Sequence, residues 1–155
     1  MRKYEKAIGE GERSVELDPN DAMAHGLLGV TLSYAERVDE AIGYLKQGIR
    51  LNPFPEYWNF YHLSRCYRMK GQYEEALVAA KKAIHLAPDS IAGYISLAAN
   101  CALLDRQEEA GVAAKKILEI DQSYSVERAS KIWPYKNQAD IKLLADALHK
   151  AGLPN

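Results

Sequence analysis

The chain has 155 residues, a length that suits one domain of ordinary size, and its formal net charge is −1. A nearly neutral chain is not steered toward nucleic acid or an anionic membrane surface, so neither is expected as a partner. No run approaches the roughly 18 apolar residues of a membrane span, and the chain begins without the apolar segment of a secretory signal. We therefore expect a cytoplasmic protein that binds neither nucleic acid nor membrane.

The first predicted element is a helix over residues 1–17, which ends at Asp18-Pro19. Its apolar residues, among them Tyr4, Ile8 and Val15, fall on one helical stripe. Aligned by the sequence period of 34 or 35 residues, this helix corresponds to the second helix of a pair whose first helix is missing. Such a half repeat, residues 3–19, leaves an apolar face uncovered. We therefore expect self-association through this N-terminal edge.

Three complete helix pairs are predicted next, as repeats over residues 22–55, 57–90 and 91–124. Asp21 suits the N-cap of the first helix of repeat 1. Pro55 suits the first turn of the helix predicted over residues 56–70. Within repeat 1, Gly29 lowers helix propensity, which makes sense if a neighbouring helix approaches closely there. The expected helices cover residues 20–34, 38–51, 56–70, 73–86, 90–104 and 107–120.

The pattern breaks after Gln122. A short helical stretch over residues 125–133 is stopped by Pro134, and Asn137 suits the N-cap of a last helix over residues 138–150. Gly152 follows that helix as a C′ glycine should. Terminal repeats of solenoids are atypical because they must cover an exposed face. Residues 125–155 are therefore predicted to be a C-terminal cap of a single domain that spans residues 1–155.

The same small and large residues recur through these pairs at a fixed spacing. Ala41 and Ala76 are 35 residues apart, Ala76 and Ala110 are 34 apart, and Pro19 and Pro53 are again 34 apart. A period of this length is typical of a solenoid of helix pairs. The predicted fold class is therefore all-α.

The repeated residues resemble the tetratricopeptide repeat pattern over roughly residues 3–122. The resemblance implies a right-handed superhelical solenoid of antiparallel helix pairs, with a concave groove lined by the first helix of each pair and a protein or peptide as its partner. The residues that carry it are His25, Leu28, Gly29, Leu32, Ala41, Leu45, Gly48 and Pro53, then Phe60, Leu63, Ser64, Tyr67, Ala76, Ala80, Ala83 and Pro88, then Tyr94, Leu97, Ala98, Cys101, Ala110, Ala114, Ile117 and Gln122.

The tail carries a second resemblance. Residues 133–140, Trp-Pro-Tyr-Lys-Asn-Gln-Ala-Asp, and residues 148–154, Leu-His-Lys-Ala-Gly-Leu-Pro, are similar to the C-terminal ends of bacterial proteins that fuse a class III adenylate/guanylate cyclase domain to tetratricopeptide repeats. This implies an alternative function, a regulatory or self-association module of a larger bacterial signalling enzyme. No cyclase catalytic domain lies within the 155 residues.

The motifs of catalysis and cofactor binding are missing, so we expect no enzyme, no cofactor and no metal site. Residues 9–14 approach a dinucleotide fingerprint, but no strand precedes them and they lie within a helix. His62 and Cys66 are spaced as a base and a nucleophile could be, yet packing beside Leu63 explains them better. Cys66 and Cys101 fit no metal or redox spacing, and we expect both to be buried and reduced.

One side of the helix predicted over residues 56–70 carries aromatic and arginine side chains, which commonly anchor interfaces. Placed by the resemblance, this side faces the concave groove; the alternative is that it packs against a neighbouring helix. The predicted groove residues are Met23, Val30, Tyr34, Trp58, Tyr61, Arg65, Arg68, Met69, Ile95 and Ala99.

The chemistry of that groove predicts the kind of ligand. Some tetratricopeptide-repeat domains hold the C-terminal carboxylate of a peptide with Lys and Asn side chains. In this chain the corresponding region contains Gly26, Val30, Tyr61 and Arg65, so we expect no such clamp. The planar guanidinium of Arg65, like that of Arg68, can pair with a carboxylate or phosphate. We expect a peptide or protein segment that combines apolar residues with at least one acidic group.

Overall fold

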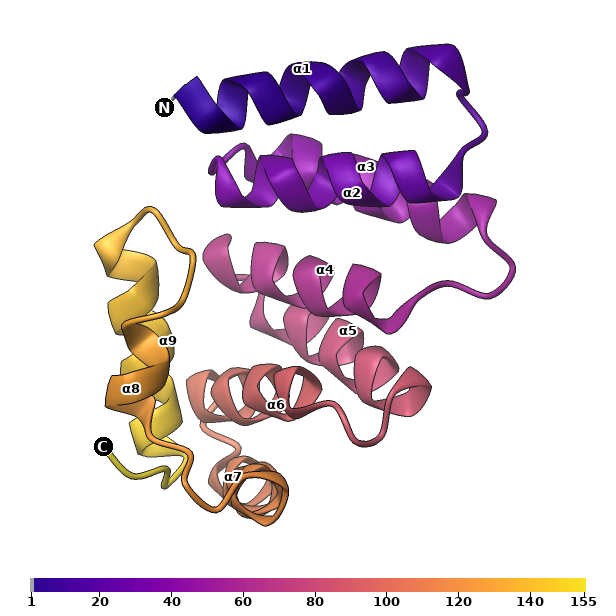
Figure 1. Cartoon of the computed structure of the whole chain (residues 1–155). Coiled ribbons are helices and arrows are strands. Elements are labelled where there is room, and N and C mark those ends of the chain that lie inside the picture. The colour runs from indigo at the N-terminus through magenta and orange to yellow at the C-terminus, as the bar shows by residue number, and fades with distance from the viewer. Residues whose placement is uncertain (1) are drawn as a thin grey trace.

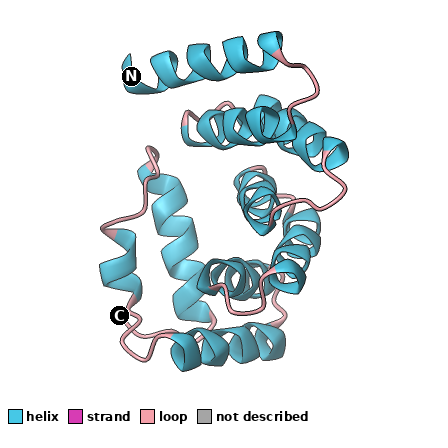
Figure 2. Cartoon of the chain, turned by 45° about the vertical axis from the view of Figure 1, so that its right-hand side comes forward, coloured by secondary structure: helices cyan, strands magenta, loops and turns pink. Residues whose placement is uncertain are grey.

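The computed structural model describes residues 2–155, and over these residues the chain is helical with no strand (Figure 1). The helices stack in chain order and are joined by short loops, as Figure 2 shows. Their bounds are α1 Arg2–Leu17, α2 Ala22–Tyr34, α3 Val38–Leu51, α4 Tyr57–Met69, α5 Tyr73–Leu86, α6 Ile91–Leu103, α7 Gln107–Ile120, α8 Val126–Ser130 and α9 Gln138–Lys150.

Three antiparallel pairs, α2 with α3, α4 with α5 and α6 with α7, form the body of the fold. Each pair turns at a residue with left-handed backbone geometry: Glu36 with φ 68°, Gly71 with φ 72° and Asp105 with φ 58°. These residues repeat at the period of the sequence. The predicted fold class, a right-handed superhelical solenoid of antiparallel helix pairs with a C-terminal capping helix, is confirmed. The residue bounds of the repeats remain predictions.

Local signals set the helix ends where the sequence indicated. The Asp21 carboxylate accepts hydrogen bonds from the backbone N–H groups of Met23 and Ala24, and the Asn137 side chain accepts one from that of Ala139. Gly152 adopts a left-handed φ of 103° after α9. The short helix is shorter than predicted, because α8 ends at Ser130, well before Pro134.

Small residues let the two helices of the first pair approach closely. At Gly29 a Cβ atom would lie 2.9 Å from the backbone N of Leu45 and 3.1 Å from the carbonyl O of Ala41. Backbone atoms cannot rotate away as a flexible side chain can. Gly29 is therefore needed where α2 crosses α3, as its cost in helix propensity suggested.

We expect Gly29→Ala to lower the free energy of unfolding by about 1–2 kcal/mol, because overpacking against the α3 backbone outweighs the gain in helix propensity. Gly43→Ala is the matched control, since Gly43 lies within α3 and a Cβ there would meet nothing within 4 Å. It should raise the stability by up to about 1 kcal/mol. Urea unfolding of both variants measures the difference, and equal effects would show that the crossing is not tight at Gly29.

The C-terminal cap does not continue the stack as another helix pair. Instead α9 packs on α6, with α8 beside it (Figure 1). Its C-terminal end is tied by an ion pair between Lys150 and Asp105 at 2.5 Å, and the loop before it by one between Lys136 and Glu36 at 3.8 Å. The cap therefore reaches from the α6–α7 turn back to the α2–α3 turn.

Candidate functional site

The candidate site lies on the inner layer formed by α2, α4 and α6, and Arg65 of α4 is at its centre. Its side chain is 2% exposed, and its Nη1 donates a hydrogen bond to Ser33 Oγ at 2.9 Å. The guanidinium lies over the ring of Tyr34 at 4.6 Å and over the ring of Tyr135 at 4.2 Å. Arg65 is thus held between an aromatic ring of α2 and one that the C-terminal cap contributes.

Arg68, one turn further along α4, belongs to a buried polar relay. It is 4% exposed, and its Nη1 donates to Asn100 Oδ1 on α6 at 3.4 Å. Asn100 Nδ2 donates to Ser64 Oγ at 2.9 Å, and that hydroxyl donates to the carbonyl O of Ala76 on α5 at 2.7 Å. The relay joins three helices and fixes the position of the Arg68 side chain.

The two arginines have no acidic partner in direct contact. No ion pair among the side chains of residues 3–155 involves Arg65 or Arg68. The Nε of Arg65 is buried and has no hydrogen-bond partner within that part of the chain. Asp140, in the first turn of α9, carries a carboxylate whose pKa is affected by Arg65. Burial raises this pKa, and the charge of Arg65 partly opposes the rise. The centre of the site is therefore positively charged and suited to an acidic group.

The aromatic and imidazole groups around Arg65 are shielded from water. Burial raises the pKa of the Tyr61 hydroxyl, with Tyr135 and Tyr34 adding to the effect, and burial likewise raises the pKa of Tyr34. Burial, with a smaller contribution from the charge of Arg65, lowers the pKa of His62 to about 4. The ring of His62 meets that of Tyr34 edge-on at 5.6 Å. His62 is accordingly a neutral packing residue at pH 7.

His62 and Cys66, which are spaced as a base and a nucleophile could be, are not activated. Burial raises the pKa of the Cys66 thiol to about 11, against the opposing effect of the arginines, and Cys66 is fully buried. Cys66 and Cys101 are both buried and unpaired, as expected. Among residues 3–155 no group of three or more His, Cys, Asp and Glu side chains is arranged to hold a metal ion. No helix within that range is long and apolar enough to cross a membrane.

The predicted groove residues fall into two sets. The more open set consists of Met23, which is 49% exposed, and the half-buried Trp58. Ile95 is half-buried and packs against the core cluster that includes residues of the cap. Asp21, Met23 and Trp58 line a cavity of about 260 Å³ between α2 and α4. Trp58 packs against α2 because Gly26 has no side chain: a Cβ there would lie 2.7 Å from Trp58 Cη2. This end of the inner layer is accessible to a ligand.

The second set is less exposed, and part of it lies against the C-terminal cap. Ala99 is fully buried in a core cluster that includes Leu144, Leu148 and Tyr135, and Tyr34 packs against the same cluster. Val30, Tyr61 and Met69 are half-buried, in contrast to Arg65 and Arg68, which are buried. That these ten residues bind a peptide stays a prediction. What the sequence reasoning missed is the part that Tyr135 and Asp140 take in the same site.

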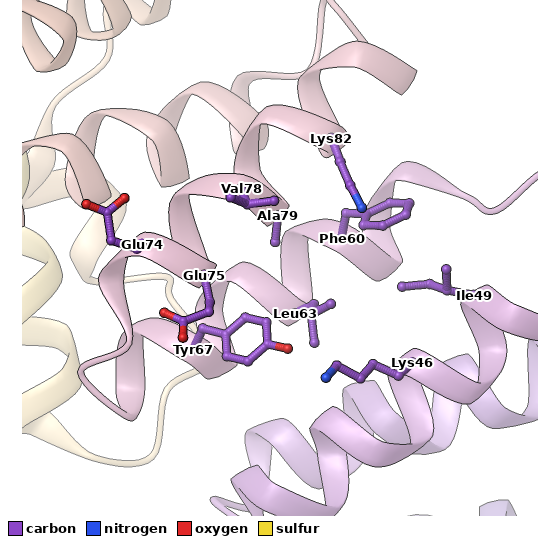
Figure 3. Close-up of a pocket in the computed structure, with 10 residues that line it drawn as sticks. All are labelled: Lys46, Ile49, Phe60, Leu63, Tyr67, Glu74, Glu75, Val78, Ala79 and Lys82. Carbon is purple, nitrogen blue, oxygen red and sulfur yellow. The ribbon is translucent and has the colours of Figure 1, made fainter.

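A second hollow lies on the opposite side of α4, between α3 and α5 (Figure 3). Its volume is about 410 Å³, and its floor is apolar, with Leu63 and Ile49 among its residues. Figure 3 shows the Lys82 side chain beside the ring of Phe60. Lys82 Nζ lies 5.6 Å from the centre of that ring. A similar hollow of about 540 Å³ recurs one repeat later. These outer hollows follow from the helix repeat and hold no unpaired buried charge.

Comparisons with known proteins agree with this architecture. Residues 59–90 match the tetratricopeptide repeat family. The cell division cycle protein 27 homolog of Caenorhabditis elegans is 31% identical over 97 residues, which are 63% of this chain and 12% of that protein. The chain therefore spans a small part of that relative's length.

Solved structures resemble the whole chain. The crystal structure of MamA superposes with a TM-score of 0.74 and 21% identity, covering 96% of this chain and 86% of that one. YrrB, described as a TPR protein with an unusual peptide-binding site, superposes with a TM-score of 0.70 and 20% identity, covering 97% of this chain and 77% of that one. Identities this low show the fold alone. Residues 59–90 match a tetratricopeptide repeat, and residues 2–155 together have the fold of a tetratricopeptide-repeat solenoid.

Proposed function

We propose that this protein is a non-catalytic scaffold that holds a peptide or a protein segment against its inner layer, at α2, α4 and α6. The observation that carries the proposal is the pair of buried arginines, Arg65 and Arg68, which have no ion-pair partner among residues 3–155. A buried charge is costly unless it is paired, so such a centre favours an acidic ligand group. The peptide-binding description of YrrB, a protein of the same fold, is consistent with this.

The proposed ligand reaches both sets of groove residues. Its apolar side chains contact Met23 and Trp58 beside the cavity of about 260 Å³, and the half-buried Ile95 further along the inner layer. Its acidic group approaches Arg65 and Arg68, whose hydrogen bonds to neutral partners leave their charges uncompensated. Apolar anchors beside a charge-assisted contact are the usual arrangement at a binding hot spot.

The test is to select 12-residue peptides from a random display library on the wild-type protein and to titrate the synthetic peptides calorimetrically. We expect the selected peptides to combine aromatic or aliphatic residues with Asp or Glu. Arg68→Gln should weaken their binding by about 10- to 100-fold, because a charge-assisted hydrogen bond is lost. Lys82→Gln, which removes a charge from the outer hollow, is the control and should leave the affinity unchanged. Peptides without acidic residues, or equal binding to both variants, would contradict the proposal.

Self-association through the N-terminal edge is a second part of the proposal. Leu17 at the end of α1 is 78% exposed, and Leu27 of α2 is 54% exposed beside a cavity of about 290 Å³ between the two helices. The predicted stripe of α1 is covered, because Ile8 is 3% exposed and Tyr4 and Val15 pack against the same core cluster. Leu17 and Leu27 are the apolar residues that remain exposed at this edge, and exposed apolar surface can form an interface. The module would then join copies of the chain. Self-association also suits the alternative function, a regulatory part of a larger bacterial signalling enzyme, which rests on the resemblance of the tail.

A further inference from the structure

The loop between α8 and α9, residues Lys131–Asn137, is called the strap here. Most of its side chains are exposed, and Ile132 is 82% exposed. Trp133 is half-buried, and Tyr135 is 8% exposed and points into the inner layer against Arg65. Trp133 stacks on Tyr135 with ring centres 5.9 Å apart. The strap therefore delivers one aromatic ring to the centre of the candidate site.

The C-terminal segment has the chemistry expected of a ligand for this site. Tyr135 supplies an aromatic ring to the Arg65 guanidinium at 4.2 Å. Asp140, five residues later, supplies a half-buried carboxylate whose pKa is raised by burial and lowered in part by Arg65 and Arg68. The aromatic ring of Tyr135 thus occupies a position that we assign to a bound peptide, and an acidic group follows it in the same continuous segment.

The strap is held much less firmly than the rest of the cap. Leu144 and Leu148 of α9 are buried in the core cluster that contains Ala99 and Ala102 of α6. The strap is joined to the body by Tyr135, which belongs to the same cluster, by the half-buried Trp133, which packs against it, and by the exposed ion pair between Lys136 and Glu36. Exposed pairs add little stability. The strap can therefore leave Arg65 while the C-terminal half of α9 stays packed.

We propose that the strap is a built-in competitor of the ligand, and that Tyr135 must leave Arg65 before the acidic and aromatic groups of a peptide can bind there. This inference rests on the proposed function. Because ligand binds only when the strap is open, the closed strap lowers the apparent affinity by the fraction of molecules that are open. The same sequence supplied on a separate peptide should bind when the strap is weakened.

The first experiment uses a synthetic peptide with the sequence of residues 131–142 as the probe, titrated by fluorescence anisotropy against the full chain. Tyr135→Ala removes the ring from Arg65 and leaves space for the ring of the peptide. We expect it to bind the peptide about tenfold more tightly, or better, than the wild type does. Tyr124→Ala is the matched control, because Tyr124 is also 8% exposed and lies in the same core cluster. It should bind as the wild type does.

The second experiment holds the strap closed, and it does not depend on whether the Tyr135→Ala variant folds. Glu36→Cys with Lys136→Cys, joined by a short bismaleimide, fixes the strap to the α2–α3 turn; Cys66 and Cys101 are fully buried and stay unmodified. We expect the cross-linked protein to bind the probe peptide at least about tenfold more weakly than the same protein before cross-linking. Asp105→Cys with Lys150→Cys, cross-linked at the far end of α9, is the control and should leave the affinity unchanged.

The outcomes separate this inference from the proposed function. Tighter binding by Tyr135→Ala together with weaker binding after the cross-link at residues 36 and 136 supports the competitor. Equal affinity in all proteins, before and after both cross-links, would overturn the competitor but leave peptide binding to the inner layer intact. If the probe peptide binds none of the proteins, the ligand chemistry of the proposed function is wrong and the competitor with it.

Discussion

Arg65→Ala is expected to lower the free energy of unfolding by about 3 kcal/mol, while Arg65→Met stays within about 1 kcal/mol of the wild type. Alanine leaves a cavity between the rings of Tyr34 and Tyr135 and removes both cation–π contacts. Methionine refills most of that volume and removes a buried charge that has no acidic partner, a replacement that is often neutral or stabilising. Urea unfolding at pH 7 measures both differences.

The same two variants separate stability from binding. Both lack the guanidinium, so both should bind a selected acidic peptide about 10- to 100-fold more weakly than the wild type, which corresponds to one lost charge-assisted hydrogen bond. Arg50→Ala is the control for stability, because Arg50 is exposed on α3 and its loss should change stability by less than about 0.5 kcal/mol. If Arg65→Ala were as stable as the Arg50 variant, Arg65 would not be packed between the two rings in solution.

Acid should destabilise the protein through His62. Burial lowers its pKa to about 4 in the folded state, compared with an ordinary value of about 6.5 in the unfolded chain. The unfolded state therefore binds the proton first as the pH falls, and the free energy of unfolding decreases between about pH 7 and pH 4. The expected contribution is on the order of 2 kcal/mol at pH 5.

His62→Phe keeps an aromatic ring beside Tyr34 but cannot take up a proton, so it should lose about 2 kcal/mol less than the wild type between pH 7 and pH 5. His85→Phe, at an exposed position on α5, should lose as much as the wild type. Urea unfolding of the three proteins at both pH values measures this. Parallel pH profiles for all three would show that His62 is accessible to protons in the folded protein.

The repeat made most of the fold predictable from the sequence. The helix ends follow from local chemistry, such as the Asp21 and Asn137 side chains that accept hydrogen bonds at N-termini. The crossing at Gly29 follows from a small residue at a repeated position, and it is confirmed by the atoms that a Cβ would meet. The small and large residues recur at 34 or 35 residues, so each pair supported the interpretation of the next.

The centre of the candidate site was less predictable, for a physical reason. Arg65 and Arg68 belong to the repeated part, and the resemblance to tetratricopeptide repeats placed them on the inner face, but it could not show what covers them. Tyr135 lies 70 residues after Arg65, in a segment that has no counterpart in the repeats. The available signal was chemical: two arginines on one inner face need partners, and the tail contains aromatic residues beside a carboxylate.

The most direct measurement of the central claim is a map of backbone amide chemical shifts as a selected peptide is added to the isotope-labelled protein. Binding at the inner layer predicts changes at residues of α2, α4 and α6, centred on Arg65 and Arg68, together with the strap as Tyr135 is displaced. Changes confined to the outer hollow near Ile49, Val78 and Lys82, with the amides around Arg65 unmoved, would contradict the account.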